Sequence, residues 1–289
     1  MSRPRGRAAP TRRVRVVRVA DDARANGVDV VAGEEPMQIR LRAGDRVAPL
    51  ATTMRTPGHD FELAAGFLLS EGLIRTRDDV RRIRYCLDVR PEERYNVVDV
   101  ELTDPTLPDL HRLERYVTTS SACGVCGKAH LDAIALPAHD PPPDAASDPD
   151  PLPPFDPEQL LAMTASLRRK QRLFGTTGGL HAAGLFGRDG TAQVVREDVG
   201  RHNALDKAVG ALALEGRDAR DAVVCVSGRA SYELLQKTVT AGARTFVAIS
   251  APSSLAIDVA RRFDVTLVGF ARPGRMNVYA GAHRIAHDA

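Results

Sequence analysis

The first third of the chain alternates apolar and polar residues with a period of two, the pattern of half-buried β-strands. In residues 37–43, MQIRLRA, one face collects the apolar side chains Met37, Ile39 and Leu41. Residues 82–89 and 96–102 alternate in the same way, and the segment 90–94 between them predicts a hairpin loop. We therefore predict a β-rich N-terminal subdomain over residues 14–115.

One helix interrupts this pattern. The stretch FELAAGFLLS, residues 61–70, repeats its apolar side chains at helical spacing. Asp60 is the predicted N-cap, because its short acidic side chain can accept a hydrogen bond from the first turn. Gly72 is the predicted end, because glycine adopts the left-handed backbone that closes many helices.

The last third of the chain alternates strand and helix. Apolar runs at 221–227, 245–250 and 265–271 predict strands that are covered on both faces. Helical patterns lie between them at residues 231–243 and 253–263, and another precedes them at residues 202–214. Such alternation predicts a parallel sheet core. The fold class is therefore α/β, or α+β overall, with an α/β core over residues 158–289.

Residues 137–157 have a different composition. The segment PAHDPPPDAASDPDPLPPFDP is rich in Pro and Asp and offers almost nothing to bury, which is typical of a linker. At its end, Asp156 and Pro157 predict the start of a helix, with Asp as cap and Pro at the first position.

Three loops follow the carboxyl ends of the predicted parallel strands, the edge at which open α/β sheets bind ligands. They are residues 227–229, 250–254 and 270–275, and the last carries Arg272 and Arg275. The first two lead into helix N-termini, which favour anions. These features predict a pocket for a phosphorylated, nucleotide-like ligand. Ser and Gly also suit strand-to-helix turns in general, and neither GxGxxG nor GxxxxGK[ST] is present, so both interpretations stay open.

Positive charge is concentrated at the N-terminus. Seven arginines and no acid occur in the first 18 residues, and removing them from the formal charge of +3 leaves −4 for the rest. We predict a basic, disordered tail over residues 1–13. A nucleic-acid binder would carry its basic charge on the folded surface, and an aromatic content of 4% without Trp argues against base stacking.

The sequence also bears on the compartment. Arg12-Arg13 suggests a twin-arginine signal, but Arg15 and Arg18 break the apolar stretch that would have to follow. No apolar run approaches membrane-spanning length. Four cysteines in 289 residues do not form a disulfide framework. We therefore expect a cytoplasmic protein with reduced thiols and no membrane partner.

A pair of cysteines, Cys123 and Cys126, stands in SSACGVCGK, in a glycine-rich segment that we predict to be a mobile loop over residues 116–130. A zinc site needs four ligands, and His130 would supply only a third. A redox site is expected between a strand and a helix. Sulfur carriage suits a mobile loop. The pattern alone leaves metal binding, redox chemistry, sulfur carriage and ordinary surface thiols open.

The other candidate residues lie in predicted regular structure. Cys86 and Cys225 each stand alone in a predicted strand and are expected to be inert. His202 begins a helix beside acidic residues, so it is either an acid/base group or a structural part of the helix start. His181 lies in a probable strand, where a structural role is the simpler expectation.

Five motifs together resemble one family. They are TTSSACGVCGK, REDVGRHNALDK, VSGRASYELLQKT, SAPSSLAIDVA and VGFARPGRMNVY, spread from about residue 50 to 280. In this order they resemble the formate dehydrogenase accessory sulfurtransferase family, FdhD. The arginine tail and the Pro/Asp segment lie outside the resemblance.

The resemblance implies a sulfur carrier between a cysteine desulfurase and the molybdenum cofactor of formate dehydrogenase. Cys123 would hold the persulfide and Cys126 would be an accessory thiol. Mo-bis(molybdopterin guanine dinucleotide) would be bound as cargo, with no metal held tightly by the protein itself. The family's cofactor-binding run corresponds to Phe270, Ala271, Arg272, Pro273, Gly274 and Arg275. A cytidine-deaminase-like core and a homodimer are also implied.

The deaminase-like fold does not imply deamination. Zinc deaminases carry H-x-E and P-C-x-x-C signatures. This sequence has no H-x-E, and Ala122 rather than Pro precedes Cys123. Two alternatives to a sulfur carrier remain: a non-catalytic chaperone that binds the cofactor and docks on apo formate dehydrogenase, and a binding module stabilised by zinc.

Overall fold

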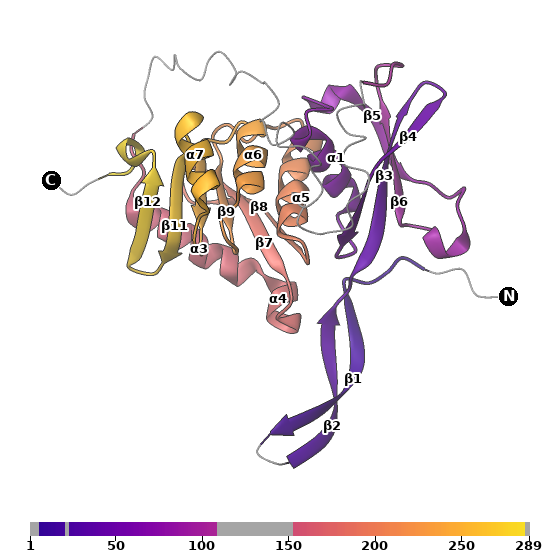
Figure 1. The fold of residues 1–289 in the computed structure, drawn as a ribbon, viewed down its shortest axis with the longest axis horizontal. Helices are drawn as coiled ribbons and strands as arrows, with labels where there is room; N and C mark the ends of the chain where they lie inside the picture. The colour runs from indigo at the N-terminus through magenta and orange to yellow at the C-terminus, as the bar shows by residue number, and fades with distance from the viewer. Residues whose placement is uncertain (1–5, 21–22, 109–152, 287–289) are drawn as a thin grey trace.

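The described part of the chain forms a mixed α/β fold with three sheets, which Figure 1 shows. The computed structural model describes residues 6–20, 23–108 and 153–286. A four-stranded sheet occupies the N-terminal half, a six-stranded sheet forms the C-terminal half, and a two-stranded hairpin projects from the body. The predicted loop over residues 116–130 lies outside the described residues, as does most of the predicted linker.

The N-terminal sheet has the strand order β4-β3-β6-β5, with β3 and β6 parallel at its centre. Its strands are β3 (Glu35–Ala43), β4 (Arg46–Arg55), β5 (Val80–Tyr85) and β6 (Val97–Leu102). The alternating side chains of β3 are fully buried on one face and pack with the helix α1 (Asp60–Ser70). Strands β5 and β6 are antiparallel neighbours. The predicted face of β3 and the predicted β5–β6 pairing are therefore confirmed.

The start of α1 differs from the prediction. Asp60 is the first residue of the helix, and the N-cap is His59, in the left-handed conformation with φ of 57°. The Asp60 carboxylate accepts hydrogen bonds from Arg55 instead. It does not cap the helix because the buried guanidinium is the stronger, charged partner. The predicted end is confirmed, since Gly72 has φ of 71° directly after the C-cap.

The six-stranded sheet has the order β12-β11-β10-β9-β7-β8. Its strands are β7 (His181–Phe186), β8 (Ala192–Asp198), β9 (Val223–Val226), β10 (Thr245–Ala248), β11 (Thr266–Arg272) and β12 (Arg275–Ala280). The predicted parallel core is confirmed for β9, β10 and β11. Strands β7 and β12 run antiparallel to their neighbours, so the whole sheet is mixed. Strand β12 was not predicted.

Helices cover both faces of this sheet. One face packs against α5 (Arg201–Leu214), α6 (Tyr232–Thr240) and α7 (Ser254–Arg262), and the other against α3 (Pro157–Lys170). Neighbouring residues of β9 enter opposite cores, which explains its continuous apolar run. The helix α3 starts as predicted, because the Asp156 carboxylate accepts the Glu158 N–H at 2.9 Å. Within the described residues, no helix combines the length and apolarity needed to cross a membrane.

The N-terminal arginines lie in a hairpin. Strands β1 (Thr11–Ala20) and β2 (Ala23–Ala32) pair antiparallel over ten residues each. The predicted disordered tail is therefore wrong for Arg12 and Arg13, which belong to β1, while residues 1–5 lie outside the described residues. The physical reason is that valines alternate with these arginines, and this alternation favours a strand in spite of the charge.

The two halves meet where α1 crosses α5 without side chains between the backbones. A Cβ atom at Gly66 would lie 1.9 Å from the carbonyl oxygen of Asp206. A Cβ atom at Gly210 would lie equally close, at 1.9 Å, to the carbonyl oxygen of Glu62. Glycine at both positions therefore sets the distance between the helices, and through them the distance between the two sheets.

The substitution Gly66→Ala is expected to lower the free energy of unfolding by at least about 2 kcal/mol, because the added methyl group must push the two backbones apart. Gly175→Ala is the matched control, since nothing lies within 4 Å of the position its Cβ would take. It should change stability by less than about 1 kcal/mol. Urea unfolding followed by circular dichroism measures both. Equal effects at the two positions would contradict the close crossing.

Candidate functional site

The three loops predicted at the sheet edge lie side by side. Ala230 and Pro252 form a parallel bridge, and the Ser253 N–H donates to the Ala230 carbonyl at 2.9 Å. The Phe270 N–H donates to the Ser250 carbonyl at 3.1 Å. Main-chain hydrogen bonds thus join the loops after β9 and β10 and the last part of β11 into one continuous edge, so the predicted convergence of the three segments is present.

The predicted cofactor-binding run continues β11 rather than forming a loop after it. Phe270, Ala271 and Arg272 belong to β11, and Pro273-Gly274 make a two-residue turn in which Gly274 has φ of 78°. Arg272 pairs with Arg275 across this turn. Both arginine side chains are exposed, whereas Ala271 is buried. The run therefore presents two guanidinium groups at the rim of the edge.

Phe270 has an unusual backbone for its residue type. Its φ is 51°, in the left-handed region that costs a non-glycine residue about 1 kcal/mol or more. The chain leaves regular pairing here, because the β11–β12 register shifts between Gly269 and Arg272. The ring remains 38% exposed. An exposed aromatic ring on a strained backbone beside two arginines is typical of a ligand-contacting position.

The hydroxyl groups of two loop serines form hydrogen bonds within the fold. The Ser227 hydroxyl accepts the Ala182 N–H at 2.9 Å, which holds β7 against β9. The Ser253 hydroxyl caps α7 by accepting the Ala256 N–H at 3.2 Å. The predicted loops are present, but these two hydroxyls are engaged with the chain. The anion-binding capacity of the edge therefore rests on the N-termini of α6 and α7 and on the exposed arginines.

His181 lies at the same edge, where β7 begins. A Cβ atom at Gly228 would lie 3.5 Å from its Nδ1, an ordinary contact distance, so the imidazole lies against the loop after β9. Burial lowers the pKa of His181, and the nearby Arg201 and His202 lower it further against a smaller opposite effect of Asp198. The imidazole is therefore neutral at pH 7, and it is able to donate one hydrogen bond and accept another.

His202 is a structural part of the helix pair α5–α6. It is 7% exposed, and its Nε2 lies 2.8 Å from the Glu233 carboxylate. Gly200, not His202, is the N-cap of α5. Of the two roles that the sequence left open, the structural one agrees with this burial. The partner Glu233 lies 31 residues further along the chain, so local sequence could not identify it.

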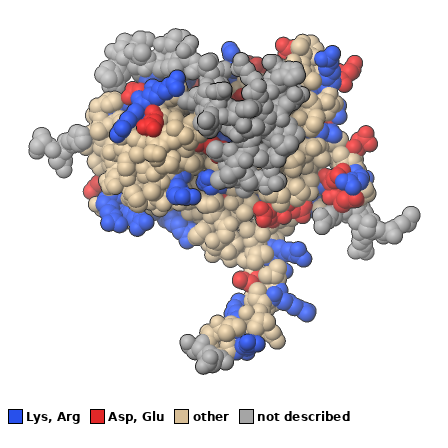
Figure 2. Space-filling view, viewed as in Figure 1, with Lys and Arg blue, Asp and Glu red and all other residues tan. Residues whose placement is uncertain are grey.

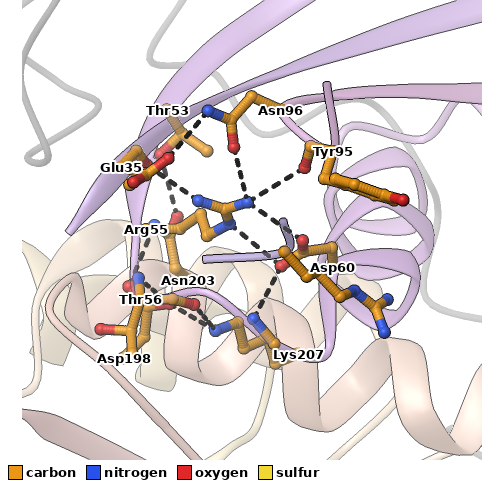
Figure 3. Close-up of polar contacts among 12 residues, drawn as sticks. Glu35, Thr53, Arg55, Thr56, Asp60, Tyr95, Asn96, Asp198, Asn203 and Lys207 are labelled. Carbon is orange, nitrogen blue, oxygen red and sulfur yellow. Dashed lines mark hydrogen bonds and ion pairs between the residues drawn. The ribbon is translucent and has the colours of Figure 1, made fainter. Parts of the chain in front are cut away.

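The motif REDVGRHNALDK mainly joins the two halves of the molecule (Figure 3). Asp198 is fully buried and accepts hydrogen bonds from the backbone of Thr56 at 3.0 Å and Gly200 at 2.8 Å. The Lys207 ammonium lies 2.6 Å from the same carboxylate and donates to the Thr56 carbonyl at 2.7 Å. Because a buried charge is costly when it is unpaired, this arrangement fixes the end of β4 against α5.

Neighbouring residues extend this clamp, as Figure 3 also shows. Asn203 donates to the Met54 carbonyl at 2.8 Å and accepts from Thr53 at 3.2 Å. On the other side, the buried Arg55 pairs with Asp60 through two hydrogen bonds of 3.0 Å. The Asn203 contacts were not predicted, because residues about 150 positions apart carry no mutual signal in one sequence.

The described thiols have no part in the edge. Cys86 and Cys225 are buried and free, and burial raises the pKa of Cys225 to about 12. The predicted strand position is confirmed for Cys225, which lies in β9, whereas Cys86 lies one residue beyond the end of β5. Cys123, Cys126 and His130 lie outside the described residues. In residues 6–20, 23–108 and 153–286, no three His, Cys, Asp or Glu side chains gather in a way that could hold a metal ion.

The model of the FdhD/NarQ family matches residues 32–286. The chain belongs to the FdhD/NarQ family. A relative in Streptomyces avermitilis, named sulfur carrier protein FdhD, is 50% identical over 281 residues, which cover 96% of each chain. A protein of the same name in Nocardia farcinica is 46% identical over 284 residues, which cover 95% of each chain.

The fold also has a solved counterpart. It is a crystal structure from Desulfotalea psychrophila of a protein described as a formate dehydrogenase accessory protein. The TM-score is 0.69 at 25% sequence identity, and the match covers 96% of this chain and 99% of that one. The resemblance found in the sequence motifs is therefore confirmed, and so is the mixed α/β fold class.

The contribution of the buried Asp198–Lys207 pair to the stability of the fold can be tested by substitution. The substitution Lys207→Met should lower the free energy of unfolding by about 3–5 kcal/mol, because it leaves the Asp198 carboxylate buried without its cation. Arg217→Met is the control, since Arg217 forms an exposed pair with Glu215 and should contribute about 1 kcal/mol or less. Urea unfolding measures both, and a small effect at Lys207 would count against the clamp.

Proposed function

We propose that this protein is a sulfur carrier that serves formate dehydrogenase. Cys123 receives sulfur from a cysteine desulfurase and delivers it to the molybdenum cofactor of that enzyme. The names of the relatives support sulfur carriage, and the described counterpart from Desulfotalea psychrophila supports the link to formate dehydrogenase. The thiol pair in SSACGVCGK supplies the chemistry that such a carrier needs.

The first transfer is a thiol–persulfide exchange. The Cys123 thiolate attacks the outer sulfur of the donor's cysteine persulfide, and the sulfur–sulfur bond of the donor breaks. The donor leaves as a thiolate, and Cys123 becomes the persulfide. Electrons balance without an added oxidant, because the sulfur moves at the same oxidation level. Cys126 is proposed as an accessory thiol in this exchange.

The joined loop edge is the proposed binding site for Mo-bis(molybdopterin guanine dinucleotide), which is the substrate to be sulfurated. This edge is the observation that carries the proposal. It brings the exposed Arg272 and Arg275, the exposed ring of Phe270 and the N-termini of α6 and α7 to one side of the sheet. Guanidinium groups and helix N-termini suit phosphate groups, and an aromatic face suits a purine.

Binding the nucleotide ends of the substrate would hold its metal centre in place for transfer. A remote binding site of this kind converts a chance encounter between sulfur donor and acceptor into an oriented one. The neutral His181 at the same edge can offer a hydrogen bond without adding charge. The proposed setting is the cytoplasm, where thiols stay reduced, and the proposed form is a homodimer, which the family resemblance implies.

An experiment that loads the protein with sulfur would identify the thiol that carries it. Incubation with a cysteine desulfurase and L-cysteine should add about 32 Da to the intact protein, in a form that dithiothreitol removes, because one persulfide sulfur is transferred. The gain should be absent in Cys123→Ala. It should persist in Cys86→Ala, since Cys86 is buried. Intact-protein mass spectrometry measures the gain.

The outcome of this experiment decides between two functions. If no form of the protein gains sulfur from an active desulfurase, the sulfur carrier is wrong. A non-catalytic chaperone that holds the cofactor for apo formate dehydrogenase would then explain the loop edge. Loading of Cys123→Ala at the normal level would reject only the assignment of Cys123.

Nucleotide binding is tested with GDP as the probe. The double substitution Arg272→Ala and Arg275→Ala should weaken GDP binding by about a hundredfold or more, because two charge-assisted hydrogen bonds are lost and each costs about 1.5–3 kcal/mol. The double substitution Arg217→Ala and Arg220→Ala removes the same charge ahead of β9, at the opposite edge of the sheet. Isothermal titration calorimetry should show unchanged affinity in this control, and equal losses would exclude a local effect.

A further inference from the structure

The projecting hairpin has one face that combines apolar and basic side chains. Directly paired residues share a face of an antiparallel ribbon, and the pairs here are Arg13 with Val30, Arg15 with Val28, Val17 with Asn26, and Val19 with Arg24. We call the surface formed by Arg13, Arg15, Val17, Val19, Arg24 and Val28 the valine–arginine face. Its valines are 61%, 66% and 50% exposed at positions 17, 19 and 28.

The charge on this face has one sign. Arg13, Arg15 and Arg24 are all exposed, and no acidic residue belongs to the ladder pairs of this face. Asp29, the acid in the described ladder, pairs with Val14 on the opposite face. Figure 2 shows mainly basic side chains along the projecting hairpin. A complementary surface would therefore have an apolar centre flanked by carboxylates.

The body of the protein supports the hairpin at its base. The Gly33 N–H donates to the Pro10 carbonyl at 2.7 Å, and β2 packs against α4 (Arg172–Thr177). Beyond the base, the ribbon extends away from the body (Figure 1). A two-stranded ribbon is marginally stable in water, so three exposed valines on one side indicate a surface that another molecule covers.

The base of the hairpin leads to the ligand edge of the large sheet. Ala32, the last residue of β2, lies 3.9 Å from the position that a Cβ atom of Gly179 would take. Two residues further on, His181 lies beside Gly228 in the loop after β9. A molecule bound along the hairpin would therefore lie on the side of the protein where the proposed cargo is held.

We propose that the valine–arginine face is the docking surface for the formate dehydrogenase that receives the sulfur. The inference rests on the proposed function, which supplies the identity of the client. Because the valine–arginine face is apolar and basic, the surface of the client that binds it would have an apolar strip with carboxylates around it. The base of the hairpin adjoins the ligand edge, so a protein docked on this face lies beside the proposed cargo, as the enzyme that receives the sulfur must.

The test measures binding of the full chain to immobilised formate dehydrogenase that lacks its sulfur, by biolayer interferometry. Arg13→Glu with Arg15→Glu reverses two charges on the valine–arginine face and should weaken binding at least tenfold. Val17→Ser with Val19→Ser should weaken it as well. The matched control is Arg12→Glu with Arg18→Glu, which reverses two charges of the same strand on the opposite face and should bind as the wild type does.

A second measurement separates this inference from the proposed function. Sulfur loading of Cys123 by the desulfurase should be unchanged in every hairpin variant, which also shows that the variants are folded. If the variants bind the client as well as the wild type does, the docking surface is wrong and the sulfur carrier stands. If the wild type does not bind the client, both are wrong. If Cys123 gains no sulfur in any form, the carrier fails whatever the binding shows.

Two other occupants of the face would also overturn the inference. A second copy of this chain is detected by light scattering after size-exclusion chromatography, as a dimer that Arg13→Glu with Arg15→Glu converts to a monomer while client binding persists. An anionic membrane is detected by sedimentation with phosphatidylglycerol vesicles, as binding that the same variant loses while client binding persists. The inference expects neither result.

Discussion

The buried carboxylate of Asp198 is the contact on which the arrangement of the molecule depends. It ends β8, lies entirely out of water, and is neutralised by Lys207 of α5. It also accepts hydrogen bonds from the backbone of Gly200, from the Asn203 amide and from the backbone of Thr56, which follows the last strand residue of β4. Removing one partner of such a pair is far more costly than removing a surface pair, so the two halves have one allowed position.

A second buried acid, Asp206, connects the two halves to α6, the helix that begins at the ligand edge. Asp206 of α5 accepts a hydrogen bond from Ser70 of α1 at 2.8 Å and forms an ion pair with Lys237 of α6 at 2.8 Å. The helix α6 begins at the loop edge, and His202 and Glu233 bind its first turn to α5. The edge where we place the cargo is therefore held by the same polar contacts that join the two halves of the molecule. The close crossing of α1 and α5 at Gly66 and Gly210 leaves these two helices little freedom to shift.

Local signals predicted the repeating elements well and failed where the structure depends on which side chains or strands pair, which the sequence does not show. Alternation identified β3, and apolar runs identified the parallel strands. Asp60 was assigned as a cap because the sequence does not show that Arg55 turns toward it. Strand β12 was missed because Arg272 to Arg275 look like a loop, although they are the turn of a hairpin. The tail predicted over residues 1–13 includes the first three residues of β1, Thr11 to Arg13, because this short stretch has no apolar alternation of its own and its pairing with β2 is not visible in the sequence.

The same limits apply to the candidate site. Its loops and its arginines were predictable, because strand-to-helix turns and Gly-rich turns have clear signatures. The partner of His202 and the clamp around Asp198 were not, because they depend on which helices the fold brings together.

If the chain acts as the proposed sulfur carrier, the burial of Cys225 bears on which of its four cysteines is loaded. With a pKa of about 12, about one in 10⁵ of these thiols is ionised at pH 7, and only the thiolate attacks a persulfide. Incorrect loading at this position is therefore suppressed in two ways, by the absence of the nucleophile and by the β-sheet that surrounds it. The hydrophobic core that stabilises the fold therefore has a second effect. It keeps a sulfur donor from reaching Cys225, which is too deeply buried to pass sulfur on.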